Sequence, residues 1–265
     1  AVPKTWDEFA TYAKQCTKTD ANGNITQAGV YLVWEEDGWN IHRPIIESFG
    51  GEWGSEDGKT TLFNKSDGAR QAWQFIVDLT IKDKVSSPSF FAGESIDAFA
   101  AGLTCYSINE PQDIGYIETN MKPGNTFIVA TMPAGPNGSF TTGSSWPLAL
   151  FAQGAKDPAK LDAATKFLMF MASTDGQALY AEGTGELPSR NDMLSDPKYT
   201  DDPIMKVYVA GLPQTNGPLE TDELAQKQCS VDMYNNVILK NVDPMKALDE
   251  GAACDQAVRD KFFAE

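Results

Sequence analysis

The chain has 265 residues, of which 42% are hydrophobic and 22% charged, so it can bury a sizeable core in one large or two modest domains. Its formal net charge of −16 argues against binding to nucleic acid or anionic membranes, because both would repel it at long range, and favours a neutral or cationic ligand. No uncharged run approaches the roughly 18 residues needed to span a bilayer, and no basic and apolar leader stands at Ala1. We therefore expect a mature, trimmed or partial chain.

The first predicted elements are a capped helix, a strand and a polar loop. Thr5, with Glu8 three residues later, has the pattern of a capping box, which predicts an amphipathic helix ending near Cys16. An apolar strand is expected over residues 28–34. The polar loop that follows carries Trp39, and a helical stretch then runs to a Gly-Gly break.

Strands and helices continue to alternate through the middle of the chain. A turn over 57–59 predicts a short strand over 60–63, and Ser66 is the expected cap of the next helix. That helix has an apolar stripe at helical spacing, formed by Ala69, Ala72, Trp73, Ile76 and Leu79. A short helix ending at Phe99 precedes a strand over 103–108.

The second half begins with a strand over 127–132 and becomes mainly helical. The Pro/Gly-rich passage 133–138 is the best candidate for a crossing between domains. A strand is expected over 146–151. Asp157, followed by proline at the first helical position, then predicts a long helix, and nearly everything after Thr174 is expected to be helical.

The cysteine pattern bears on redox compartment and on metals. Cys229 and Cys254 lie at similar distances on either side of a turn signal, so in an antiparallel helix pair they could face each other and form a disulfide, which suits an oxidising compartment. The alternative is four buried thiols, with Cys16 and Cys105 as the other two. Because there is no C-x-x-C spacing and only one histidine, His42, we expect no zinc site and no cofactor.

Five landmark segments occur in an order and spacing that cover essentially the whole chain. They are Pro3-Lys4-Thr5-Trp6-Asp7-Glu8-Phe9, Gly50-Gly51, Ala98-Phe99-Ala100-Ala101-Gly102, Met132-Pro133-Ala134-Gly135-Pro136 and Leu187-Pro188-Ser189-Arg190. Taken together, they resemble the family 1 extracellular solute-binding proteins, which include maltose-binding protein. Within that resemblance, Ile108-Asn109-Glu110-Pro111 looks like the strand end that lines the family's ligand cleft, and residues 243–248 look like its C-terminal helix pair.

The resemblance implies an α/β, periplasmic-binding-protein-like fold of type II, with two lobes joined by a hinge and a ligand between them. By analogy, residues 1–138 and 205–265 form the second lobe, and residues 139–204 belong to the first lobe and the hinge. The family's first lobe normally opens with a long segment that has no counterpart here, so this lobe is only partial and a missing first-lobe segment is an expected partner. Without it, residues 139–204 would expose apolar surface.

Tryptophans are the first candidates for a ligand site. A sugar offers hydroxyl groups and a weakly apolar ring face, so its site needs aromatic platforms beside planar hydrogen-bonding groups. Trp34 and Trp39 flank an acidic loop after a strand, where binding residues gather in α/β proteins. Trp146, directly after Ser145, matches a position where the family often presents an aromatic, and core packing at the start of a strand is its alternative. We expect Trp34, Trp39, Ser145 and Trp146 to contact ligand.

Polar candidates follow the strand over 103–108. Asn109, Glu110 and Gln112 begin the next loop. The family places an aromatic platform close to where Gln112 stands, so this departure weakens the argument for stacking on a carbohydrate. Arg190, in a loop that approaches the cleft in some relatives, is either a cleft residue or a surface charge.

The other three tryptophans are expected to stabilise the fold rather than to contact a ligand. Trp6 and Trp73 lie in helical patterns that place them in the core, and Trp53 is expected to cover the edge of the lobe.

The expected function is the substrate-binding component of an ABC importer, which binds a sugar or related polar molecule and delivers it to membrane permease subunits. Its place is the periplasm or the cell exterior, with a lipid anchor if the cell is Gram-positive. A glycan-binding or scaffold protein with the same fold is the main rival. Glu35, Asp37 and Glu110 would permit a glycoside hydrolase, but there is no G-x-S-x-G or H-E-x-x-H motif, and we expect no enzyme.

Overall fold

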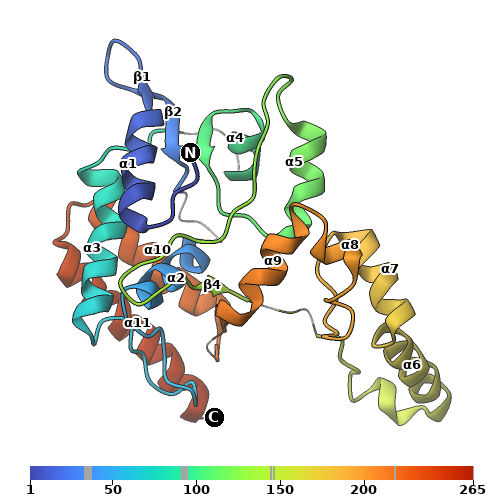
Figure 1. Ribbon diagram of the computed structural model, residues 1–265. Coiled ribbons are helices and arrows are strands. Elements are labelled where there is room, and N and C mark those ends of the chain that lie inside the picture. The colour runs from blue at the N-terminus through green and yellow to red at the C-terminus, as the bar shows by residue number, and fades with distance from the viewer. Residues whose placement is uncertain (33–37, 91–94, 144, 146, 218, 265) are drawn as a thin grey trace.

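The computed structural model describes residues 1–32, 38–90, 95–143, 145, 147–217 and 219–264, with the side chains of residues 38–40 also outside the description. Most of the chain forms one α/β body, on the left in Figure 1, around a three-stranded sheet. Its strands are β1 (Lys18–Thr19), β2 (Ile25–Val30) and β3 (Thr104–Tyr106), in the order β1-β2-β3. β1 is antiparallel to β2, whereas β2 and β3 are parallel, so a long helical crossover connects the latter pair.

Helix α1 (Trp6–Cys16) begins as its cap signal predicts. The Thr5 hydroxyl accepts a hydrogen bond from the Glu8 backbone N–H at 3.2 Å, but the Glu8 carboxylate accepts from the backbone N–H of Lys4 at 2.7 Å rather than from that of Thr5. The helix packs against β2 and buries Trp6, whose indole N–H donates to the Ser48 hydroxyl at 2.8 Å. A capped amphipathic helix thus forms one side of the core.

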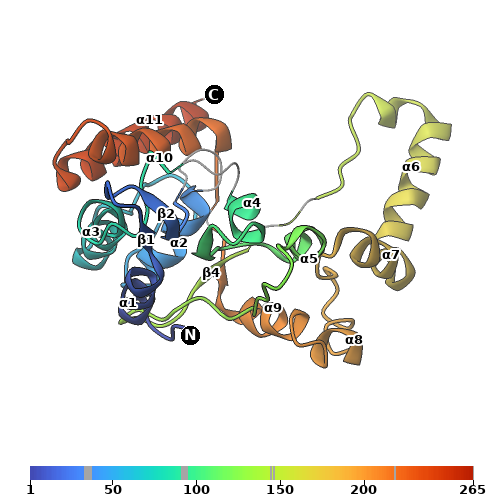
Figure 2. The ribbon, with the colours of Figure 1, turned by 90° about the horizontal axis from the view of Figure 1, so that it is seen from above.

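Four longer helices complete the main body. They are α2 (Gly38–Ser48), α3 (Asp67–Ile81), α10 (Glu223–Ile238) and α11 (Pro244–Ala264). Ser66 caps α3, and the predicted apolar stripe of this helix is buried. Helices α10 and α11 lie side by side in both views (Figures 1 and 2), and a disulfide between Cys229 and Cys254 joins them, which confirms that prediction. A second disulfide, between Cys16 and Cys105, joins α1 to β3, so the alternative of four thiols is wrong.

A smaller group of elements lies beside the sheet. Helix α4 (Ser95–Ala100) precedes β3, and a short 3₁₀ turn over Pro111–Asp113 leads into α5 (Ile114–Asn120). Further along, β4 (Thr141–Thr142) pairs in parallel with β5 (Thr215–Asn216), and α9 (Met205–Gly211) precedes β5. Two chain segments far apart in sequence therefore run together next to the main body.

Residues 147–204 extend away from the main body as an arm. It contains a 3₁₀ turn over Gly154–Lys156 and helices α6 (Pro158–Met171), α7 (Thr174–Thr184) and α8 (Pro197–Thr200). Figure 2 shows α6 at the far end of this arm, and none of its residues is buried. Phe151 is 85% exposed and Met169 is 68% exposed. The apolar exposure expected for residues 139–204 is therefore present.

Three predicted strands are not formed. Residues 60–63 make only an isolated bridge, between Gly54 and Thr61, and residues 127–132 and 147–151 have no strand assignment. The reason is that a strand needs a neighbour for its backbone hydrogen bonds, and local apolar sequence does not supply one. Trp53 is also a correction, because it is buried in the core against Phe63 rather than at an edge.

Two further observations concern the described helices: whether any of them could cross a membrane, and the place of Trp39 in α2. None of the described helices combines the length and the apolar character required to cross a bilayer. The backbone of Trp39 lies in the first turn of α2 rather than in a loop, so the predicted position of this residue is wrong in its secondary structure.

Candidate functional site

A hollow of about 330 Å³ opens where the loop after β3 meets the segments that run beside the main body. We call it the central hollow. Its walls include residues 107–111, 127–132 and 141–143, together with Glu186, Leu187, Val207, Tyr208, Gly211 and Thr215. A volume of this size suits a small molecule.

The loop after β3 presents polar groups to the central hollow in a fixed arrangement. The Asp113 carboxylate accepts hydrogen bonds from the Glu110 backbone N–H at 3.1 Å and from the Asn109 side-chain amide at 3.3 Å. The Gln112 side-chain amide donates to the Glu110 carboxylate at 3.0 Å. Because Asp113 closes the 3₁₀ turn in this way, Asn109 and Glu110 are positioned before any ligand arrives.

Tyr208 of α9 forms the opposite wall and contacts the same loop. Its hydroxyl donates to the Asn109 backbone carbonyl at 3.4 Å. Burial raises the pKa of this hydroxyl to about 12, and the negative charges of Asp113 and Glu110 add to the rise. Tyr208 therefore stays a neutral hydrogen-bonding group at any physiological pH.

The loop after α7 reaches the same place because of one glycine. Gly185 ends α7 in the left-handed region, with φ of 77°, and a Cβ there would lie 3.5 Å from the Gln112 Cα. The next residue, Glu186, lines the central hollow and accepts a hydrogen bond from the Tyr180 hydroxyl at 3.2 Å. The left-handed conformation of Gly185 thus directs the chain so that the Glu186 carboxylate faces the central hollow beside the loop after β3.

The charges around the central hollow are all of one sign. Among the described residues that line it, the charged side chains are Glu110 and Glu186, and none is lysine or arginine. Apolar side chains such as Ile108 and Leu187 supply much of the remaining wall. Such a surface can accept hydrogen bonds from hydroxyl or amine groups while packing against an apolar face, and it would repel an anion.

The predicted ligand contacts fall into three groups. Asn109 and Glu110 line the central hollow. Gln112 and Ser145 are exposed and are not among its lining residues. The third group lies outside the description: all of Trp34 and Trp146, and the side chain of Trp39.

Glu186 and Tyr208 line the central hollow but were not identified from the sequence. Glu186 lies four residues before Arg190, in the loop that the family resemblance places near the cleft, so that loop was a usable signal. Tyr208 had no such signal, because its approach to Asn109 depends on how α9 packs. Arg190, by contrast, pairs with Asp192 at 2.7 Å and donates to the Ala172 carbonyl, so it is a surface charge.

Comparisons with known proteins identify the family and the fold of the chain. The family model for bacterial extracellular solute-binding proteins matches residues 1–207. Among solved structures, an ABC transporter solute-binding protein from Thermotoga lettingae bound with α-D-tagatose is 22% identical over 97% of this chain and 65% of its own, with a TM-score of 0.78. The GacH receptor of Streptomyces glaucescens, solved unliganded and with acarbose, is 21% identical over 99% of this chain and 66% of its own, with a TM-score of 0.79.

A third structure, the maltose/maltodextrin-binding domain MalE from Bdellovibrio bacteriovorus bound to maltotriose, is 23% identical over 100% of this chain and 68% of its own, with a TM-score of 0.75. Among curated protein sequences, none matches significantly. The chain spans about 65% of the length of the first solved structure that it matches. These likenesses confirm the predicted α/β, periplasmic-binding-protein-like fold, and the family match shows that the chain belongs to the bacterial extracellular solute-binding proteins.

Proposed function

We propose that this chain is the solute-gripping part of the substrate-binding component of an ABC importer, and that it holds a sugar or a related polar molecule between two lobes that close on it. The observation that carries the proposal is the central hollow, where Asn109, Glu110 and Tyr208 converge from distant segments. Support also comes from solved structures of the same fold, whose bound molecules are tagatose, acarbose and maltotriose. Closure follows from ligand contacts on both sides of a hinge, because only the closed state makes both sets.

The proposed division into lobes comes from the family resemblance. Residues 1–138 and 205–265 would form the second lobe, and residues 139–204 would belong to the first lobe and the hinge. The apolar and exposed arm supports this division, because side chains such as Phe151 and Met169 require a cover. A first-lobe segment would supply that cover, and it would also complete the far wall of the ligand site.

The negative charge of the site restricts the range of solutes that we propose. With Glu110 and Glu186 as the charged groups of the described lining, a neutral or amine-bearing sugar fits and a sugar phosphate does not. Membrane permease subunits are the proposed partners, in the periplasm or at the cell exterior. The proposal includes no catalytic step: the site residues hold and orient a solute.

Calorimetric titration of the whole protein tests the proposal. The probes are maltose, maltotriose, D-tagatose, glucosamine and glucosamine 6-phosphate. We expect at least one neutral or amino sugar to bind with a Kd in the micromolar range or tighter, about −8 kcal/mol, and the phosphate to bind much more weakly. A protein that ignores the whole panel would be a scaffold, and one that releases glucose from maltose would be a hydrolase.

Substitutions then test the aromatic contacts proposed from the family resemblance. Trp39→Ala and Trp146→Ala should each weaken binding of the tightest sugar by roughly 1–3 kcal/mol if the indoles stack on it. Phe262→Ala, which truncates an exposed aromatic near the end of α11, is the matched control and should leave the Kd unchanged. A lower melting temperature with an unchanged Kd would instead assign the tryptophan to the core.

A further inference from the structure

The last two turns of α2 hold two other segments of the chain through a buried polar cluster. The Glu47 carboxylate accepts a hydrogen bond from the Asn216 side-chain amide at 2.9 Å, and Arg43 pairs with Glu220 at 2.5 Å. The Asn137 side-chain amide donates to the Glu47 backbone carbonyl at 3.2 Å. We call Arg43, Glu47, Asn137, Asn216 and Glu220 the anchor cluster.

The anchor cluster reaches the central hollow through β5. Successive side chains of a strand point to opposite faces, so Thr215 lines the hollow while Asn216 bonds to Glu47 behind it. β4 pairs with β5 and supplies Thr142 to the same wall. Helix α2, in turn, begins at Gly38, at the end of the acidic stretch between Trp34 and Trp39 where the sequence predicts ligand contacts. One cluster therefore ties a wall of the site to α2.

The charges around Glu47 are few and come from three elements. Arg43 lies one turn earlier on α2, stacked over the Trp53 ring at 5.5 Å, and Glu220 follows β5. From α11, Arg259 approaches Arg43 but is already paired with Asp255 at 2.7 Å.

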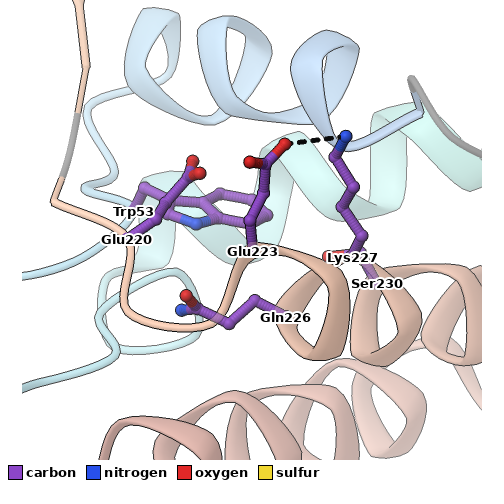
Figure 3. Close-up of a pocket in the computed structure, with 6 residues that line it drawn as sticks. All are labelled: Trp53, Glu220, Glu223, Gln226, Lys227 and Ser230. Atoms are coloured by element: carbon purple, nitrogen blue, oxygen red, sulfur yellow. Dashed lines mark ion pairs between the residues drawn. The ribbon is translucent and has the colours of Figure 1, made fainter. Parts of the chain in front are cut away.

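Near the anchor cluster, the Lys227–Glu223 ion pair and the neutral side chain of His42 contribute no net charge. Trp53 and Glu220 line a small cavity (Figure 3). Its volume of about 10 Å³ has room for one water molecule. The nearby Lys227 pairs with Glu223 at 2.9 Å. His42, also on α2, is fully buried, and burial holds its pKa well below the usual range, so it stays neutral.

We infer that Glu47 is a positioning residue: its carboxyl group holds the β4–β5 pair against α2 and makes the firmness of that hold depend on pH. Glu47 is 4% exposed, and one of its carboxylate oxygens has no hydrogen-bond partner within the described part of the chain. Such a group costs much more to bury when it is charged than when it is protonated. The inference rests on the proposed function only in treating residues 139–143 as a crossing between the lobes.

The direction of the effect follows from linkage. Burial raises the pKa of Glu47 from 4.5 to about 7, while Arg43 and the hydrogen bond from Asn216 partly oppose the rise. As pH rises through 7, the Glu47 carboxyl group loses its proton. The resulting charge is more stable in any state in which water reaches Glu47, so such states become more populated. The least costly such state separates β4–β5 from α2, so this local opening should become up to about 300-fold more frequent at high pH, the ratio that corresponds to pKa values of 4.5 and 7.

Hydrogen exchange of the whole protein, corrected for intrinsic rates, measures that opening from pH 5.5 to 8.5. In the wild type we expect the protection of peptides covering 139–145 and 213–219 to fall as pH rises, with a midpoint near 7. Glu47→Gln keeps an acceptor for Asn216 and stays neutral, so its profile should be flat. Asn216→Ala removes the donor from an exposed position and should raise exchange in these peptides at every pH.

The control is a peptide from α3, which should show the same pH profile in all variants. A Glu47→Gln profile that matches the wild type, or a wild type with no midpoint, would overturn the inference. The measurement uses no ligand, so it can fail while sugar binding is present, and it can succeed on a protein that binds none of the sugars. A Kd for the tightest sugar that varies with pH in the wild type but not in Glu47→Gln would extend the inference to binding.

Discussion

Cys16, the last residue of α1, forms a disulfide with Cys105 in the middle of β3, and the two Cα atoms are 6.6 Å apart. This bond spans 89 residues of sequence, whereas the Cys229–Cys254 bond spans 25. The first disulfide holds the strand that leads to Asn109, and the second holds two helices on the far side of the body. The two bonds should therefore differ in what they do for ligand binding as well as for stability.

Replacing Cys16 and Cys105 together by serine should lower the free energy of unfolding by about 4.6 kcal/mol, because the longer of the two closed loops restricts the unfolded chain more. The Cys229/Cys254 pair should cost about 3.5 kcal/mol. Urea denaturation measures both. We further expect the first pair, but not the second, to weaken the binding of the tightest sugar, because β3 leads directly into the loop of the central hollow whereas α10 and α11 do not. Equal effects on the Kd would contradict that assignment.

Gly185 gives a second prediction, on the loop that carries Glu186. Gly185→Ala forces a side chain into the left-handed region, where it costs roughly 1–2 kcal/mol, and places a Cβ 3.5 Å from the Gln112 Cα. We expect lower stability from this backbone strain, and a weaker Kd because relief of the strain would displace the loop that carries Glu186.

The matched control for this change is Gly183→Ala. Gly183 lies inside α7, and a Cβ there meets nothing within 4 Å. Alanine should therefore stabilise the helix by up to about 1 kcal/mol and leave the Kd unchanged. Thermal unfolding and calorimetry separate the two variants, and a harmless Gly185→Ala would show that the loop does not depend on its cap.

The sequence predicted the elements whose signals are local. Thr5, Ser66 and Asp157 each accept a hydrogen bond from a backbone N–H in the first turn of the helix that they were expected to cap. The strands over 127–132 and 147–151 failed because strand formation depends on a neighbour that local sequence does not encode. Helix ends are decided within one turn, whereas sheets are decided by the whole fold.

The same distinction applies to the site. Asn109 and Glu110 were found because side chains at the end of a strand tend to meet a ligand in α/β folds. Tyr208 approaches them from about a hundred residues away, and the hydrogen bond between Asn216 and Glu47 spans 169 residues. No spacing rule joins residues at such separations, so a single sequence gives one wall of the site and leaves the opposite wall undetermined.

The raised pKa of Glu47 also predicts how the free energy of unfolding of the whole protein depends on pH. Its folded-state pKa is raised, so its favourable contribution is fully present below pH 4.5 and is lost as pH rises through about 7. Glu47→Gln should therefore raise the free energy of unfolding at pH 8.5 by up to about 3 kcal/mol and change it little at pH 4. Denaturation at both pH values checks this. Glu223→Gln, at an exposed ion pair, should change stability by less than about 1 kcal/mol at either pH.

The exposed arm gives the last prediction, which tests the proposed division into lobes. In the 265-residue chain alone, Phe167 and Met169 of α6 are exposed, so Phe167→Ser and Met169→Ser should change the free energy of unfolding by less than about 0.5 kcal/mol and should reduce dye binding to apolar surface. In the whole protein, a first-lobe segment would cover the same side chains. There we expect the same substitutions to cost about 2–5 kcal/mol, as for buried apolar residues. Lys166→Ser, on the polar side of α6, is the control and should be neutral in both contexts, since its ion pair with Asp162 is exposed. If Phe167→Ser is as harmless in the whole protein as in the isolated chain, the arm faces solvent and residues 139–204 do not belong to a covered lobe.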